Sequence, residues 1–227
     1  FNWAKDLSSS LRVNGSYGSA TNLPDHYKNN LNITQGQTDL KPERSKNFEV
    51  GLIKDYGWGT TEAKLYKSKV TDAFTYLDPD SNWVTDNAYY RNDGIVDIKG
   101  AELTLDTELL GWQLDANIDF NQAINKSTNL QKGRRPNRSI GVNLSKASGK
   151  WQRSVNWSAK SWVWDKDNHS NGKLGGYGLL SLSTSYDFNE DLSVYLNINN
   201  ALDKDYEMAQ GYNTLGRNIN LGISRTF

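Results

Sequence analysis

The sequence predicts an all-β protein whose strands form an antiparallel meander. Short runs of alternating apolar and polar residues recur along most of the chain, and polar turns and loops separate them. These connections alternate between long and short, as they do where hairpins join neighbouring strands of a barrel. No stretch of about 18 consecutive apolar residues is present, so the sequence offers no transmembrane helix. We count about ten strands, either closed into a barrel or part of a larger sheet.

The composition agrees with a barrel that has a polar lumen. Hydrophobic residues make up 36% of the chain and the mean hydropathy is -0.74, but a barrel strand needs apolar residues only at alternate positions. Eight Trp and twelve Tyr suit the aromatic girdles of such a barrel, although an aromatic-rich β-sandwich would show the same number. The net charge is zero, so no overall electrostatic field favours the binding of nucleic acid. The absence of Cys excludes disulfides and thiolate metal sites.

The first half of the chain alternates between expected strands and polar connections. Its pattern predicts strands over residues 8–19, 60–77 and 84–108, a long loop over 20–40 and a turn over 78–83. The apolar period breaks near Lys67 to Lys69, where we expect a bulge or an exit into water. Asp78, Asp80 and Asn82 begin as a calcium loop does, but the Gly and the distal Glu are missing, which favours a turn.

The run that starts at Trp112 helps to decide whether the fold is a barrel or a sandwich. One of its faces is apolar through Trp112, Leu114, Ala116, Ile118 and Phe120, whereas the other carries only Asp, Asn and Gln. A water-filled lumen tolerates such dense Asp and Asn better than the exposed face of a sandwich. We therefore predict an antiparallel transmembrane β-barrel. Further strands are expected over residues 138–147, 151–164, 177–188, 191–199 and 218–227.

The C-terminal stretch carries a recognisable pair of motifs. Two alternating runs flank the segments DKDYE and GYNTLGR, and the chain stops on an aromatic residue within a strand. These segments resemble the closing box of TonB-dependent receptors, and the terminal aromatic residue resembles the assembly signal of outer-membrane barrels. The matching residues are Asp203, Lys204, Asp205, Tyr206, Gly211, Tyr212, Gly216, Arg217 and Phe227.

Other segments extend this resemblance to nearly the whole chain. Residues 39–52 are similar to the family pattern N-x-x-L-x-P-E-x-S-x-x-x-E-x-G, and residues 98–102 are similar to its strand motif [IV]-x-G-x-E. The resemblance implies that residues 1–227 form about ten strands of the C-terminal part of a 22-stranded barrel, without its plug domain and TonB box. It implies a place in the bacterial outer membrane. Within the family, the chain looks most like the cobalamin receptors.

The resemblance also implies a function and partners. The parent receptor would take up cobalamin or, as the runner-up, a ferric siderophore, and it would contact outer-membrane lipid. It would meet a TonB-type energising complex through the missing plug, and the barrel-assembly machinery through its C-terminal strand. A passive pore and a substrate of barrel assembly remain alternatives for the fragment. A soluble β-sandwich that binds carbohydrate or protein through Trp162 and Trp164 is the rival from another class.

The basic end of the loop over residues 123–137 is the best ligand candidate. The cluster contains Lys132, Arg134, Arg135 and Arg138, and the resemblance places Arg134 and Arg135 near the substrate site. The competing interpretation is a solvated loop end whose cations pair with lumen carboxylates. Trp162 and Trp164 are expected at the rim of the barrel.

The sequence contains no signature of catalysis. It has no G-x-S-x-G, phosphate loop or H-E-x-x-H motif. Its two histidines, His26 and His169, lie in polar loops and are expected to be solvated. We therefore predict a protein that is not an enzyme, with no cofactor and no metal site.

Overall fold

A single antiparallel sheet dominates the computed structural model, which describes residues 1–227 except 38, 78–86, 93, 171 and 227. Among the described residues the sheet has twelve strands, in the order β1-β2-β3-β4-β7-β8-β10-β11-β14-β15-β16, with β9 paired to β8 beside this path. The predicted all-β, antiparallel fold is confirmed. The strands are β1 (Asn2–Ser8), β2 (Leu11–Asn22), β3 (Glu43–Asp55), β4 (Gly59–Thr71), β7 (Ile95–Leu109), β8 (Trp112–Asn125), β9 (Leu130–Gln131), β10 (Arg138–Ser148), β11 (Trp151–Lys160), β14 (Tyr177–Asp187), β15 (Leu192–Asn199) and β16 (Asn218–Arg225).

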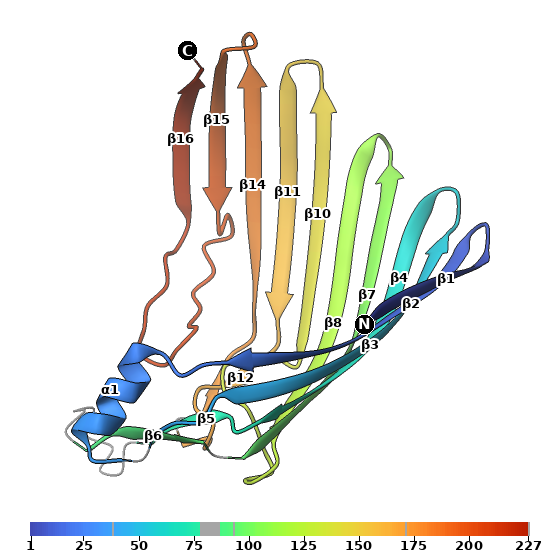
Figure 1. Ribbon diagram of the computed structural model, residues 1–227. Helices are drawn as coiled ribbons and strands as arrows, with labels where there is room; N and C mark the ends of the chain where they lie inside the picture. The colour runs from blue at the N-terminus through green and yellow to red at the C-terminus, as the bar shows by residue number, and fades with distance from the viewer. Residues whose placement is uncertain (38, 78–86, 93, 171, 227) are drawn as a thin grey trace.

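The two ends of the sheet differ. Short turns join the strands at one end, and long connections fill the other, where they form one helix and two small hairpins (Figure 1). These elements are α1 (His26–Thr34), the pair β5 (Phe74–Leu77) and β6 (Tyr89–Asn92), and the pair β12 (Val163–Trp164) and β13 (Lys173–Leu174). No helix in the described part of the chain is long and apolar enough to cross a membrane.

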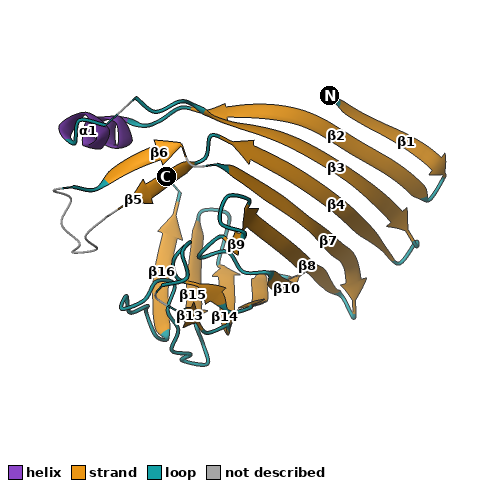
Figure 2. Ribbon diagram, turned by 90° about the horizontal axis from the view of Figure 1, so that it is seen from below, coloured by secondary structure: helices purple, strands orange, loops and turns teal. Residues whose placement is uncertain are grey.

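The sheet is open. It curves across its width, and β1 and β16 form its two separate edges (Figure 2). β16 pairs with β15 alone, and β2 pairs with β1 and β3, so among the described residues the segment 8–19 does not close onto the last strand. The strands therefore form part of a barrel wall, and a narrow pore made by self-closure is not what the structure shows.

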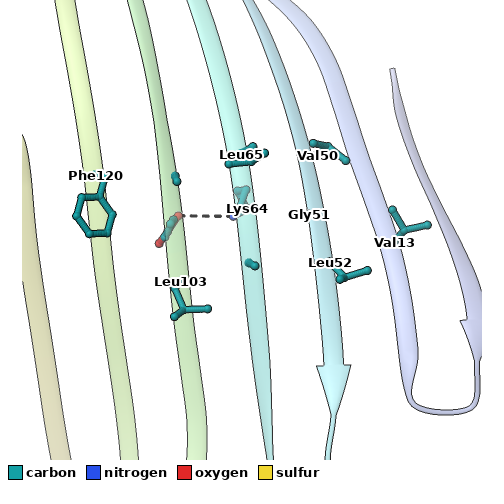
Figure 3. A pocket seen from close by; sticks show the side chains of 11 residues that line it. Val13, Val50, Gly51, Leu52, Lys64, Leu65, Leu103 and Phe120 are labelled. Atoms are coloured by element: carbon teal, nitrogen blue, oxygen red, sulfur yellow. Dashed lines mark ion pairs between the residues drawn. The ribbon is translucent and has the colours of Figure 1, made fainter.

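One face of the sheet is mainly apolar in every part of its width. Directly opposite residues on this face include Val50 and Leu65 on β3 and β4, and Ala101 and Phe120 on β7 and β8. Figure 3 shows Val50, Leu65 and Phe120 along a shallow apolar groove on this face. The pattern continues to the last strand, where Leu221 is 74% exposed. Such a face needs an apolar environment to cover it.

The opposite face is polar and carries its own network. Lys64 lies directly opposite Glu102, with 3.8 Å between Nζ and Oε2 (Figure 3). The Tyr66 hydroxyl donates to Asp119 at 3.0 Å and accepts from the Asn121 amide at 2.8 Å. This segregation of apolar and polar residues follows the alternation in the sequence.

Gly100, in the strand motif, allows the Tyr66 side chain to lie close against β7. A Cβ at Gly100 would come within 2.3 Å of the Tyr66 ring and 2.4 Å of the Phe120 carbonyl oxygen, which is backbone and cannot yield. We expect Gly100→Ala to lower the free energy of unfolding by about 1–3 kcal/mol, the range for overpacking. Thermal unfolding of the protein in detergent measures this. Gly18→Ala is the matched control, since its Cβ would meet nothing within 4 Å; equal unfolding temperatures for the two variants would contradict the prediction.

The structure corrects the expectation of a structureless loop over residues 20–40. Helix α1 lies there, and the Asp25 carboxylate caps it by accepting from the Lys28 backbone N–H at 2.8 Å. The Lys28 ammonium also bonds to this carboxylate and lowers the pKa of Asp25 below its ordinary value. The buried Asn32 amide holds the helix against β6, because it accepts from Tyr90 N and donates to Tyr90 O, both at 2.7 Å. This tertiary contact explains a helix that lacks an apolar period.

The strand boundaries in the first half are also corrected. Residues 60–77 and 84–108 were each expected as one strand, but the main-sheet strands β4 and β7 are separated from β5 and β6 at Asp72 (φ 55°) and Gly94 (φ 99°). The bulge expected near Lys67 to Lys69 is wrong, because both lysines pair in regular register with β3 and β7. β1, which precedes the first expected strand, was missed. The expected turn at residues 78–83 lies outside the described residues.

A candidate ligand-contact site at the loop end

Asp165 joins three connections at the loop end of the sheet. Its carboxylate, with a side chain only 2% exposed, accepts from the Arg134 guanidinium at 2.9 and 3.0 Å and from the Gln210 backbone N–H at 3.3 Å. The Arg134 backbone N–H donates to the Trp164 carbonyl at 2.7 Å. Residues 126–137, 161–176 and 200–217 are thereby held together, and we call them the loop cluster.

A second link runs parallel to the first. The Lys132 ammonium pairs with the Asp167 carboxylate, which also accepts from the Gly133 backbone N–H at 2.7 Å. Gly133 permits this close approach, because a Cβ there would lie 2.7 Å from the carbonyl carbon of Lys166. Two of the four predicted cations, Lys132 and Arg134, therefore form ion pairs with carboxylates. These carboxylates belong to a neighbouring loop and not to strands that face the lumen.

Aromatic rings form one side of the loop cluster. The Trp164 ring stacks on His169 with centroids 4.0 Å apart, and it meets Trp162 edge-on at 5.9 Å. The Lys173 ammonium lies 3.9 Å from the Trp162 ring centroid and 4.9 Å from that of Trp164. His169 was expected to be solvated, and this prediction is wrong. Its Nε2 lies 2.7 Å from the Gln131 carbonyl oxygen, and its ring is covered by Trp164. The Trp162 side chain is 45% exposed.

The two predicted arginines are in different situations. Arg134 adopts φ 54° and turns its guanidinium onto Asp165. The Arg135 side chain is exposed and makes no hydrogen bond or ion pair with another residue in the described ranges. Sequence reasoning missed Asp165, Asp167 and Lys173, which it treated as parts of a polar loop. The signal was the acidic start of DKDNHSNGK, which complements the basic segment KGRR.

The C-terminal motif builds the connection between β15 and β16. Buried Asn200 (φ 48°) makes two hydrogen bonds of 2.9 Å with the backbone of Lys204, and Asp203 accepts from the Arg217 backbone N–H at 2.7 Å. The Tyr206 ring packs on Tyr177 at 4.4 Å. These contacts stabilise the connection between the two strands.

The other motif residues lie in the same connection. Tyr212, Lys204 and Asp205 are exposed. Gly211 has φ 78°, and a Cβ at Gly216 would lie 2.8 Å from Asp203 Oδ1. Phe227 lies outside the described residues.

The geometry defines a class of protein. An antiparallel sheet with one apolar and one polar face, short turns at one end and long loops at the other is the wall of a transmembrane β-barrel. The chain belongs to the TonB-dependent receptor-like β-barrel family, whose model matches residues 1–201. Within the described ranges, no three His, Cys, Asp or Glu side chains gather so that they could hold a metal ion.

Relatives agree with this membership. The chain is 28% identical over 217 residues to the vitamin B12 transporter BtuB of Photobacterium profundum, across 94% of this chain and 35% of that protein. The copper transporter OprC has a TM-score of 0.80 at 19% identity, over 100% of this chain and 38% of its own. A mutant ferric enterobactin receptor, PfeA from Pseudomonas aeruginosa, gives 0.78 at 18%, over 100% and 39%. The chain thus spans about a third of the length of its curated relative, and the structural likenesses support the fold.

Proposed function

We propose that this chain forms part of the barrel of an outer-membrane receptor that takes up a scarce small molecule. The observation that carries the proposal is the loop cluster, which presents the exposed Arg135 and Trp162 at the loop end of a barrel wall. In such receptors the loops face the outside of the cell and the wall encloses the path inward. The apolar face would contact outer-membrane lipid, and the polar face would line the lumen.

Cobalamin is the ligand that we favour. The relative that matches 94% of this chain is named as a vitamin B12 transporter. A ferric siderophore is the second candidate, because solved structures of the same fold include a ferric enterobactin receptor and a receptor bound to ferripyoverdine. A free guanidinium such as that of Arg135 suits the anionic groups of ferric chelates as well as phosphate and amide oxygens of cobalamin.

The energising and assembly partners follow from the same proposal. A TonB-type complex would act through a plug domain of the complete receptor. The barrel-assembly machinery would act on β16, whose outer edge is unpaired in the described structure.

The test is ligand binding by the complete receptor, with cyanocobalamin and a ferric catecholate measured separately. We expect Arg135→Ala to weaken binding of the true ligand about tenfold or more, since a hydrogen bond to a charged group is worth about 1.5–3 kcal/mol. Lys126→Ala is the matched control, because it removes an exposed cation from the same connection. If neither ligand binds to the wild type, the uptake proposal fails. If one ligand binds with unchanged affinity to the Arg135→Ala variant, Arg135 does not contact the ligand.

A further inference from the structure

The polar face of the sheet divides into two halves that differ in charge. On β3, β4, β7 and β8 it is acidic: Lys64 is the one cation on these described strands, and the carboxylates include Glu49, Glu62, Glu102, Asp106, Asp115 and Asp119. On β10, β11, β14, β15 and β16, which stand side by side in Figure 1, hydroxyl and amide side chains take their place. The charged residues on this face of the five described strands are Lys160 at the loop end and Asp187 at the turn end. We call the polar face of these five strands the uncharged wall.

A row of neutral side chains crosses the uncharged wall at one height. Ser145, Ser154, Ser183, Asn197 and Asn220 follow each other on neighbouring strands, each directly opposite the next. The Ser154 and Ser183 hydroxyls lie 2.7 Å apart and share a hydrogen bond. The first four residues of the row line a hollow of about 370 Å³ in the surface of the sheet. Hydroxyl and amide groups from four strands can therefore meet a molecule in this hollow.

Tyr195 closes one side of the hollow with an aromatic ring. Its side chain is 40% exposed, and its ring lies close against β16, where a Cβ at Gly222 would come within 2.3 Å of the ring. The hollow therefore offers an aromatic surface together with neutral donors and acceptors, a combination that is common in ligand sites. Hydrogen bonds between neutral groups are about half as strong as those to charged groups. A ligand can both enter and leave such a site, as transport requires.

The loop cluster stands at the loop end of the uncharged wall. Residues 126–137 lead into β10, residues 161–176 join β11 to β14, and residues 200–217 join β15 to β16. Arg135 and Trp162, the proposed ligand contacts, thus belong to connections of these strands. Ser183 lies about 20 Å along β14 from Tyr177, the first residue of the strand at the loop end. A ligand released from the loop cluster would reach the hollow without crossing the acidic half of the polar face.

We propose that the ligand crosses the lumen along the uncharged wall and pauses in the hollow at Ser154, Ser183 and Tyr195. The inference rests on the proposed function and deepens it, because it assigns the ligand to a chemical class: no net charge, with many amide and hydroxyl groups. Such a ligand can exchange one neutral hydrogen bond for the next along the row. An anionic ferric chelate meets Lys160 as the only cation on the described strands of this wall, and the carboxylates of the other half repel it.

Single cysteines test this route, since the chain contains no Cys of its own. Ser183→Cys puts a thiol in the hollow. Thr104→Cys is the matched control, because Thr104 lies on the same face at a similar distance from the turn end, but between Glu62 and Asn117 in the acidic half. Cells that express each complete receptor are treated with fluorescein maleimide, and the uptake of radiolabelled cyanocobalamin and its Kd at the cell surface are then measured. We expect the modified Ser183→Cys receptor to lose most of its uptake with an unchanged Kd. The modified Thr104→Cys receptor should match the wild type treated with the same reagent.

Two further measurements accompany this comparison. Ser183→Trp and Thr104→Trp repeat it without a reagent, and a shift on heating in a gel shows that each variant has folded. The wild type is also offered a ferric catecholate, which it should not take up.

Three outcomes would overturn the inference while the proposed function stands. Equal uptake by the two modified cysteine variants, or a larger loss in Thr104→Cys, would place the route elsewhere. A weaker Kd in modified Ser183→Cys would make the hollow part of the capture site and not a separate station. Uptake of the ferric catecholate by the wild type would contradict the assigned ligand class. If the wild type binds neither ligand, the proposed function fails together with this inference.

Discussion

Arg134→Ala should release the loop cluster and lower its local stability by about 2 kcal/mol. The substitution leaves the carboxylate of Asp165, 2% exposed, without the guanidinium that now lies 2.9 Å away. Breaking a buried ion pair costs about 3–5 kcal/mol, and we reduce this figure because the Arg134 side chain is 53% exposed and screened by water. Hydrogen exchange should therefore become faster in residues 161–176 and around Gln210, which are joined to Arg134 through Asp165.

The neighbouring arginine provides the control for this prediction. Arg135→Ala removes the same kind of side chain one residue away, but it breaks no hydrogen bond or ion pair within the described protein. We expect unchanged exchange in the loop cluster for that variant. Arg134→Ala/Asp165→Asn should recover part of the protection, because no carboxylate is left buried beside the lost guanidinium. Unchanged exchange in Arg134→Ala would show that the loop cluster holds together without this ion pair.

Asn200→Ala should destabilise the C-terminal hairpin by about 3 kcal/mol. Asn200 is 5% exposed and makes two hydrogen bonds of 2.9 Å to the backbone of Lys204, each worth about 1 kcal/mol. Its φ of 48° lies in the left-handed region, which Asn tolerates and Ala adopts at a cost of about 1 kcal/mol. Urea unfolding of the complete receptor in detergent, followed by the loss of the heat-modifiable band, measures the change.

Asn199→Ala is the matched control for this hairpin. Asn199 is exposed and joins Asn218 through one side-chain hydrogen bond of 3.0 Å. We expect its effect to stay within about 0.5 kcal/mol, as for most surface substitutions. A similar loss in the two variants would mean that the Asn200 side chain does not organise the closing motif.

Lys67 and Lys69 lie on the apolar face of β4 without interrupting the strand. The sequence predicted a bulge or an exit into water near these lysines, because they break the apolar period. The strand instead continues in register through Lys67 and Lys69. A strand can keep such residues on its apolar face where that face reaches the polar surface of a membrane.

The sequence alone determined the sheet and its two faces. Alternation has a period of two, and each strand needs only its own residues to show which side is apolar, as in the run from Trp112 to Phe120. The closing motif could also be predicted from the sequence, because Asn200 and Asp203 form hydrogen bonds with residues of the same connection. These are short-range features, so a linear pattern is enough to reveal them.

Only the tertiary structure decided the helix, the strand breaks and the separate roles of the two arginines. Helix α1 depends on Asn32 bonding to β6, 58 residues away in sequence. Arg134 and Arg135 are chemically identical in the sequence, and only the position of Asp165 in another loop pairs the first and leaves the second exposed. A contact between distant segments has no local signature, because its free energy appears only once the sheet has brought both partners together.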